Sequence, residues 1–298
     1  MIDVVITWVD GNDPRLAAKR RAYATGTAVE THDDVAGATR YAADGEIHWC
    51  VRSIERFAPW VRKIFIVTDG QNPQVRTDRI PVEIIDHKVI FRGYEQYLPT
   101  FNSRTIETML WRIPGLSDRY IYLNDDFAFI NPVEPADFFD SEGRPVVYGY
   151  RHSTLTARLG RLWERVRSPR HRKVKFRDGM LNAALELGLS EFYRLQHVPH
   201  GIRRDVLERW FREHPESLVS NISHRFRSAE QFNPQELQYL LCGSEVRDHR
   251  PVLIYIEPAH PEIAAKAGAK FFCVNSLDQF SPEGKALVRQ FLENRFDG

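Results

Sequence analysis

Cysteine is scarce in this 298-residue chain. It contains only Cys50, Cys242 and Cys273, and no Cys-x-x-Cys pair. Cysteines this few and this far apart argue against a disulfide framework and against a zinc site. A reducing compartment fits them best, so we expect a protein of the cytoplasm.

Long apolar stretches are missing as well. No uninterrupted apolar run approaches the roughly 18 residues that a membrane-spanning helix needs. The first residues, MIDVVITWVDGNDP, lack the basic segment followed by an apolar segment that marks a secretory signal. The sequence therefore predicts a soluble protein, with peripheral attachment to the inner face of the membrane as an open alternative.

Net charge is nearly absent too, because 41 Lys and Arg residues face 40 Asp and Glu residues. Nothing global points to nucleic acid, and we expect no nucleic-acid partner. The strongest local cluster is the segment 151–177, with ten Lys or Arg residues and one acid, Glu164. Two interpretations stay open: a solvated amphipathic helix with a basic loop, or a docking surface for an anionic acceptor or membrane.

The first half of the chain alternates between strand-like and helix-like segments. This alternation predicts βαβ units and an α/β fold with a mainly parallel central sheet. The expected strands are 3–9, 63–70, 82–91, 119–125 and 145–150, and the expected helices are 48–61 and 102–113.

The second half is more helical. We expect two halves, 1–150 and 151–298, which could also form one continuous domain. The expected helices of the second half are 179–189, 201–214, 233–243 and 281–296, and its expected strands are 251–258 and 270–276.

Polar residues stand where three of the expected strands stop, in TWVDG, VTDG and YLNDD. Asp-Gly alone is a turn signal. Ligands of parallel sheets, however, bind beyond the carboxyl ends of the strands, so three such ends predict one shared mouth. If the last strand stops at Leu123 or Asn124, Asp125 and Asp126 both turn toward that mouth and suit Mg²⁺ or Mn²⁺. The alternative is a hydrogen-bonded turn at the strand end.

Three further segments carry residues suited to phosphate chemistry. His197 and His200 precede an expected helix, and histidine suits general-base work, although a capping or core role is the alternative. Arg225 and Arg227 each offer a planar fork to a phosphate, or simply a surface ion pair. A probable helix start at Asn102, Ser103 and Arg104 provides free N–H groups for an anion.

Taken in chain order, these segments resemble the four conserved regions of the Stealth phosphotransferases. The resemblance is carried by IDVVITWVDGNDP, VRSIERFAPWVRKIFIVTDGQNP with LPTFNSRTIETMLWRIPGLSDRYIYLNDDFAF, QHVPHGIRRDVLERW, and HRFRSAEQFNP with KFFCVNS. That family includes bacterial capsule and exopolysaccharide hexose-1-phosphate transferases and the animal enzyme that places GlcNAc-1-phosphate on lysosomal glycoproteins. This chain is similar to the minimal bacterial form.

The resemblance implies a fold related to the GT-A glycosyltransferases, with a nucleotide-sugar-binding half at 1–150 and an acceptor-binding and catalytic half at 151–298. It also implies a reaction in which a hydroxyl of a polysaccharide or glycan acceptor attacks the β-phosphorus of a UDP-sugar, either UDP-GlcNAc or another UDP-hexose. Sugar-1-phosphate moves, a phosphodiester forms and UMP leaves, which serves capsule or exopolysaccharide synthesis. Two alternatives remain open: a GT-A-like glycosyltransferase that releases UDP, and a non-catalytic protein that binds carbohydrate or polyanion through 151–177.

Site residues follow from the resemblance, motif by motif. His197 would be the catalytic base, with His200 as its rival, and Arg227 would hold the transferring phosphate. Asp125, also counted as catalytic, and Asp126 would bind Mg²⁺ or Mn²⁺ or orient the pyrophosphate. The implied donor-binding residues are Thr7, Trp8, Asp10, Gly11, Arg52, Asp69, Asn102, Ser103 and Arg104.

The chain departs from the family pattern at two positions. His48 stands in EIHWCVRSI where the family often has Arg, and Ser276 stands in CVNS where it often has Asp. If either missing charge contacts a ligand, donor preference or metal affinity changes. Neither position lies in the motifs of His197 or Arg227, so the expected reaction class stays the same.

Overall fold

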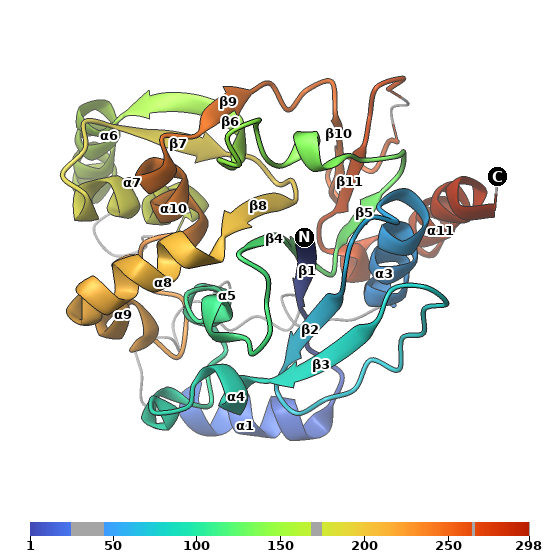
Figure 1. The fold of residues 1–298 in the computed structure, drawn as a ribbon, viewed down its shortest axis with the longest axis horizontal. Helices are drawn as coiled ribbons and strands as arrows, with labels where there is room; N and C mark the ends of the chain where they lie inside the picture. The colour runs from blue at the N-terminus through green and yellow to red at the C-terminus, as the bar shows by residue number, and fades with distance from the viewer. Residues whose placement is uncertain (25–44, 168–174, 264–265, 298) are drawn as a thin grey trace.

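The computed structural model describes residues 1–24, 45–167, 175–263 and 266–297 (Figure 1). Its central sheet has five strands in the order β3-β2-β1-β4-β8, of which the first four are parallel and β8 is antiparallel to β4. The predicted α/β fold with a mainly parallel sheet is therefore confirmed. The five strands are β1 (Ile2–Thr7), β2 (Ile64–Thr68), β3 (Val82–Asp86), β4 (Arg119–Asn124) and β8 (His200–Arg203).

Both faces of this sheet are covered, which explains why its central strands are apolar at nearly every position. Val4 and Ile6 of β1 pack on one face with α3 (Glu46–Phe57), while Val5 packs on the other face with α8 (Arg204–Glu213). All three valine and isoleucine side chains are fully buried. The second face is also covered by α5 (Ser103–Glu107) and α9 (Pro215–Ile222).

Two smaller sheets flank the central one. One has the order β10-β11-β5 and the other β7-β6-β9. Because β4 pairs with β8 and β5 with β11, both halves of the chain contribute strands to common sheets. The strands of the small sheets are β5 (Phe127–Phe129), β6 (Val146–Ser153), β7 (Glu191–Leu195), β9 (Glu245–Arg247), β10 (Leu253–Ile256) and β11 (Phe271–Val274).

The remaining helices complete the fold. No helix in the described ranges is both long and apolar enough to cross a bilayer. These helices are α1 (Pro14–Ala24), α4 (His87–Ile90), α6 (Thr154–Arg167), α7 (Phe176–Glu186), α10 (Pro234–Cys242) and α11 (Pro282–Asp297), with 3-10 turns at Glu95–Tyr97, Leu110–Arg112, Pro135–Asp137 and Leu277–Gln279.

Several sequence predictions placed element boundaries wrongly. The expected helix 48–61 ends at Phe57, and the expected helix 102–113 gives way after Glu107 to the 3-10 turn Leu110–Arg112. The expected strand 82–91 stops at Asp86, because the Asp86 carboxylate accepts a hydrogen bond from the Lys88 N–H at 2.7 Å and starts α4. The expected helix 201–214 begins only at Arg204. Before it, β8 needs Gly201, since a Cβ there would overlap the carbonyl oxygen of Phe138.

Candidate active site

The carboxyl ends of β1, β2 and β4 open into one cavity of about 510 Å³. Thr7 and Trp8 line it after β1, Asp69 after β2, and Asp125 and Asp126 after β4. The three strands are parallel neighbours with β1 in the middle, so their ends meet at one edge of the sheet. The predicted shared mouth is confirmed.

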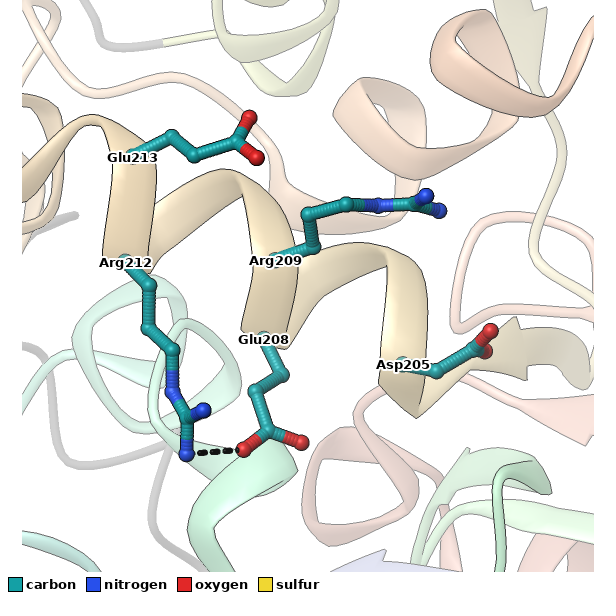
Figure 2. Close-up of a pocket in the computed structure, with 5 residues that line it drawn as sticks. All are labelled: Asp205, Glu208, Arg209, Arg212 and Glu213. Atoms are coloured by element: carbon teal, nitrogen blue, oxygen red, sulfur yellow. Dashed lines mark ion pairs between the residues drawn. The ribbon is translucent and has the colours of Figure 1, made fainter.

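A second hollow lies on the surface of α8, and Figure 2 shows that a single helix supplies its lining. Three acidic and two basic side chains line it, and Glu208 pairs with Arg212 at 2.5 Å one helical turn away. Such a self-neutralising helix face gives a substrate little to bind. We therefore place the candidate site at the strand ends. The residues that line this hollow are Asp205, Glu208, Arg209, Arg212 and Glu213.

Three carboxylates form what we call the acidic wall of the cavity: Glu46, Asp125 and Asp126. Strand β4 ends at Asn124, so both aspartates lie in the turn before β5 and both reach the cavity. Burial, followed by the charges of Asp126 and Glu46, raises the pKa of Asp125 well above its usual range. Burial and Glu46 raise the pKa of Asp126 to about 7.

The acidic wall has the chemistry of a divalent-cation site. Within the described part of the chain, the buried Oδ1 of Asp126 has no hydrogen-bond partner, and a buried carboxylate oxygen without a partner is costly. Among the described residues, no three His, Cys, Asp or Glu side chains are already gathered as metal ligands. Mg²⁺ commonly takes only one or two protein carboxylates and completes its shell with water and substrate phosphate, so the wall fits this ion.

The same cavity is also lined by His197 and Arg227, which we call the basic wall. The imidazole of His197 is stacked between Phe176 and Tyr255, with ring centroids at 5.2 and 5.5 Å and interplanar angles of 22° and 24°. Burial and the nearby Arg227 charge lower the pKa of His197. Its ring remains accessible from the cavity. A neutral, accessible imidazole can accept a proton from a bound hydroxyl.

His200 is placed differently although it lines the same cavity. Its Nδ1 lies 3.1 Å from the Tyr239 hydroxyl, and burial together with His197 lowers its pKa to about 3. A group with so low a pKa is a weak base, since it holds a proton poorly. The geometry therefore favours His197 over His200 for the role of base.

Arg227 is held at the cavity by α5. Its Nη2 donates a hydrogen bond to the Ser103 hydroxyl at 3.0 Å. Arg225, two residues earlier, instead donates to the carbonyl oxygens of Pro99 and Gln96 and lies over the ring of Tyr23. Of these two arginines, Arg227 is the one that lines the cavity.

Asn102 and Arg104 also line the cavity, but their polar groups are engaged by the protein. The Asn102 amide donates to the carbonyl oxygens of His224 and Phe226 at 3.1 and 3.0 Å, and its own oxygen caps α5. The buried guanidinium of Arg104 donates to the carbonyl oxygens of Lys175, Phe176 and Ser228. These contacts fasten the loop of Arg227 and the start of α7, where Phe176 lies, so they give both residues a positioning role.

The other expected donor-binding residues divide into two groups. Thr7 and Trp8 line the cavity, and the Thr7 hydroxyl lies 3.0 Å from the Tyr122 hydroxyl. Asp69 lines it too and pairs with Lys19 at 2.7 Å.

Asp10, Gly11 and Arg52 are not brought to the cavity lining. The Asp10 carboxylate instead accepts a hydrogen bond from the Asn12 N–H at 2.9 Å in the turn after β1. Arg52 is exposed on the outer side of α3, 5.3 Å from the ring centre of Phe296. The neighbours of Arg52 at Val51 and Ser53 fill the buried side of the helix, which leaves Arg52 facing outward.

Sequence reasoning missed several residues of the lining. Glu46 begins α3, and Glu107 accepts hydrogen bonds from the Tyr122 hydroxyl at 3.1 Å and the Gln235 amide at 3.0 Å. His87 follows β3, and burial lowers its pKa to about 4. The strand-end rule applied to 82–86 would have found His87, whereas Glu46 and Glu107 carry no comparable signal.

The two departures from the family pattern are placed unequally. Ser276 lines the cavity and adopts a left-handed backbone conformation with φ of 59°. His48 is exposed on α3 and lies outside the lining. Of the two, Ser276 is therefore the one placed to influence a bound ligand.

Comparison with known proteins identifies conserved regions in the chain. Residues 2–28 match conserved region 1 of the Stealth proteins, and residues 40–147 match conserved region 2. The chain belongs to the Stealth family. These regions contain β1, β2, β3 and β4, and hence all three strand ends at the cavity.

Curated relatives of this Stealth chain are named exopolysaccharide phosphotransferases. One from Streptomyces coelicolor is 36% identical over 293 residues, which cover 92% of this chain and 47% of the relative. The relative CpsY from Mycobacterium tuberculosis is 30% identical over 319 residues, covering 99% of this chain and 56% of its own length. The chain thus spans about half the length of the curated relatives it matches.

Among solved structures, the chain is similar to the galactosyltransferase LgtC, a GT-A glycosyltransferase. One LgtC structure, in complex with donor and acceptor sugar analogues, matches with a TM-score of 0.45 at 11% identity and covers 100% of this chain and 95% of LgtC. An active-site mutant of LgtC matches with a TM-score of 0.47 at 12% identity, covering 99% of this chain and 95% of the mutant. This similarity concerns the fold alone and says nothing about the reaction.

Proposed function

We propose that this Stealth protein transfers sugar-1-phosphate from a UDP-sugar to an acceptor hydroxyl, with release of UMP, in the synthesis of a cell-surface polysaccharide. The observation that carries the proposal is one cavity whose lining combines a carboxylate oxygen with no hydrogen-bond partner among the described residues and an accessible, neutral histidine beside an arginine. The names of the curated relatives support transfer of a phosphate-containing group in exopolysaccharide synthesis.

The proposed chemistry needs a proton acceptor and neutralisation of phosphate charge. The acceptor hydroxyl donates its proton to His197, and its oxygen forms a bond to the β-phosphorus. The bond from that phosphorus to the bridging oxygen breaks, and the electron pair leaves with UMP. Arg227 binds the oxygens of the transferring phosphoryl group, where negative charge is spread in the transition state.

The acidic wall would hold Mg²⁺ or Mn²⁺ through Asp125 and Asp126. When bound, the ion would neutralise pyrophosphate charge and so lower the barrier to UMP departure. The stacking of Phe176 and Tyr255 holds the His197 ring in one plane, and Ser103 holds the Arg227 fork. Such positioning supplies much of the catalysis in phosphoryl transfer.

Identification of the released nucleotide tests the proposal. The protein is incubated with Mg²⁺, a panel of UDP-sugars and a panel of oligosaccharide acceptors, and nucleotides are separated by ion-exchange chromatography. We expect UMP with one donor. UDP as the sole product would favour a GT-A-like glycosyltransferase instead. Release of no nucleotide, with carbohydrate binding unchanged in His197→Ala and Arg227→Ala, would favour a binding protein.

A further inference from the structure

Helix α6 presents an apolar stripe to solvent. Its five members lie at positions i, i+4, i+7, i+8 and i+11, and each is between 51% and 70% exposed. Exposed side chains of this size are normally scattered singly, and a contiguous group marks an interaction site. We call this group the α6 stripe: Leu155, Leu159, Leu162, Trp163 and Val166.

The stripe faces directly away from the rest of the protein. At about 100° per residue, its members fall within a sector of about 100° on one side of the helix. The opposite side holds Ala157, which packs into the core, and Arg161, whose guanidinium donates to Asn182 at 3.0 Å on α7. Helix α6 lies at the edge of the molecule, at the end opposite to α11 (Figure 1). Among the described residues its outward face is therefore exposed and can meet a large partner.

Positive charge borders the stripe on both sides. By the same helical spacing, Arg158 lies along one edge of the stripe and Arg167 along the other, and both are exposed. Neither forms an ion pair with any residue that the structure describes. The one acid of the helix, Glu164, points toward the protein side, where Lys175 and Arg177 pair with it.

We propose that the α6 stripe docks the protein onto an anionic lipid surface. A helix that lies in a membrane interface inserts an apolar face, often with Trp at its centre, while flanking Lys or Arg residues meet lipid phosphates. A second copy of the chain is the poorer occupant, because face-to-face packing of two stripes would bring their flanking arginines together. The docking is independent of the proposed reaction, since no stripe residue lines the cavity.

Vesicle sedimentation with the full chain tests the docking. We expect binding to vesicles of phosphatidylcholine with one third phosphatidylglycerol, and binding at least tenfold weaker to pure phosphatidylcholine. Leu159→Ser with Trp163→Ser should weaken binding by more than about 100-fold, because two inserted apolar side chains are lost. The matched control is Leu287→Ser on α11, which removes a leucine that is 60% exposed elsewhere and should bind normally.

The charged border has its own variant. Arg158→Gln with Arg167→Gln should weaken binding to the anionic vesicles by about 30-fold, since each cation near such a surface contributes about a fivefold factor. Tryptophan emission should shift to the blue on binding, and Trp163→Phe should abolish most of that shift while leaving the protein bound.

Three results would overturn the docking. They are equal binding to neutral vesicles, unchanged binding of the Leu159→Ser and Trp163→Ser variant, and a concentration-dependent dimer that this variant abolishes in sedimentation velocity without lipid. The last result would assign the stripe to self-association. UMP release from the UDP-sugar in the presence of soluble acceptors should be the same in all stripe variants. Failure of the docking is therefore distinguishable from failure of the proposed reaction.

Discussion

The two walls of the cavity are built in different ways. The basic wall is held by the protein itself, because His197 lies between two aromatic rings and Arg227 donates to Ser103. The acidic wall includes an Asp126 oxygen with no hydrogen-bond partner among the described residues. The basic wall is thus fixed by contacts within the protein, whereas the acidic wall leaves an oxygen for the cation that we propose.

Burial shifts the pKa values of the two walls in opposite directions, and in both cases it favours the neutral form of the side chain. It lowers the pKa of His197 and raises the pKa values of Asp125 and Asp126, because low polarity disfavours the charged form of any group. A neutral histidine is ready to accept a proton. A protonated aspartate is not ready to bind a metal, so cation binding must displace a proton.

The largest expected effect lies on the basic wall. His197→Ala should lower the rate of transfer by about 10²–10⁴-fold, the usual loss for a general base, because it removes the proposed proton acceptor. The affinity for the UDP-sugar should stay within a few-fold of wild type, measured by calorimetry. Single-turnover assays with the best UDP-sugar give the rate.

His200→Ala is the matched control for that experiment, since His200 lines the same cavity and has a pKa of about 3. We expect a loss of less than about tenfold from it. If His197→Ala had near-normal turnover and His200→Ala were inactive, His200 would be the base.

The next largest effect concerns the acidic wall and pH. The pKa of Asp126 is raised to about 7 in the folded protein, so this group stabilises the fold at low pH and loses that contribution as pH rises through 7. In EDTA the free energy of unfolding should therefore fall between pH 5 and pH 8. We expect a fall on the order of 3 kcal/mol from both aspartates, after allowing for water in the cavity.

Asp125→Asn with Asp126→Asn should flatten that pH dependence, and Mg²⁺ should restore stability at pH 8 only in the wild type. Urea unfolding at several pH values measures both effects. Asp69→Asn is the control, because it removes a carboxylate of the same cavity that already pairs with Lys19. If the pH profiles of the wild type and the double variant were superimposable, the pKa values of Asp125 and Asp126 would not be raised in the folded protein.

The sequence predicted the strand-end aspartates better than the contacts that support the basic wall, for a physical reason. Strand periodicity and the strand-end rule depend on local pattern, so they placed Asp125 and Asp126 correctly at the mouth. The basic wall depends on contacts between distant segments, such as Arg104 with the carbonyl oxygens of Phe176 and Ser228. No local pattern shows these contacts, and Asn102 and Arg104 accordingly looked like anion ligands.

Predictions of element boundaries were wrong for a related reason. The segment 201–203 reads as the start of a helix, but its pairing with β4 and the close approach of Gly201 to Phe138 decide for a strand. Arg52 likewise carries no local sign of which helix face it occupies relative to the cavity. The resemblance to the family implied that Arg52 binds the donor, but in the packed α3 its side chain points outward, over the ring of Phe296.

Alanine substitutions at two glycines test how firmly Arg104, which supports the basic wall, is held. A Cβ at Gly179 would lie 2.8 Å from the Arg104 guanidinium carbon, and that group cannot yield freely because main-chain carbonyl oxygens hold it. Gly179→Ala should therefore destabilise the protein by about 2 kcal/mol. It should also slow transfer while leaving Mg²⁺ affinity unchanged, because only the basic wall is disturbed.

Gly160→Ala on α6 is the matched control, since nothing lies within 4 Å of its added Cβ. This change should stabilise the protein by up to about 1 kcal/mol, as alanine favours a helix over glycine. The midpoint of thermal unfolding should fall in Gly179→Ala and rise in Gly160→Ala. Equal effects of both substitutions would mean that Arg104 is not tightly held.

The smallest expected effect comes from Ser276, the departure from the family pattern that lines the cavity. Its left-handed backbone is a conformation that Asp adopts more readily than most residues, so Ser276→Asp should fold without added strain. Main-chain pairing of Val274 with Asp126 places the new carboxylate on the acidic side of the cavity. We expect Mg²⁺ affinity to rise by about two- to fivefold, measured by calorimetry. His48→Arg restores the other family residue outside the cavity and should change nothing, so an equal gain from both would mean that long-range charge, and not the acidic wall, sets cation affinity.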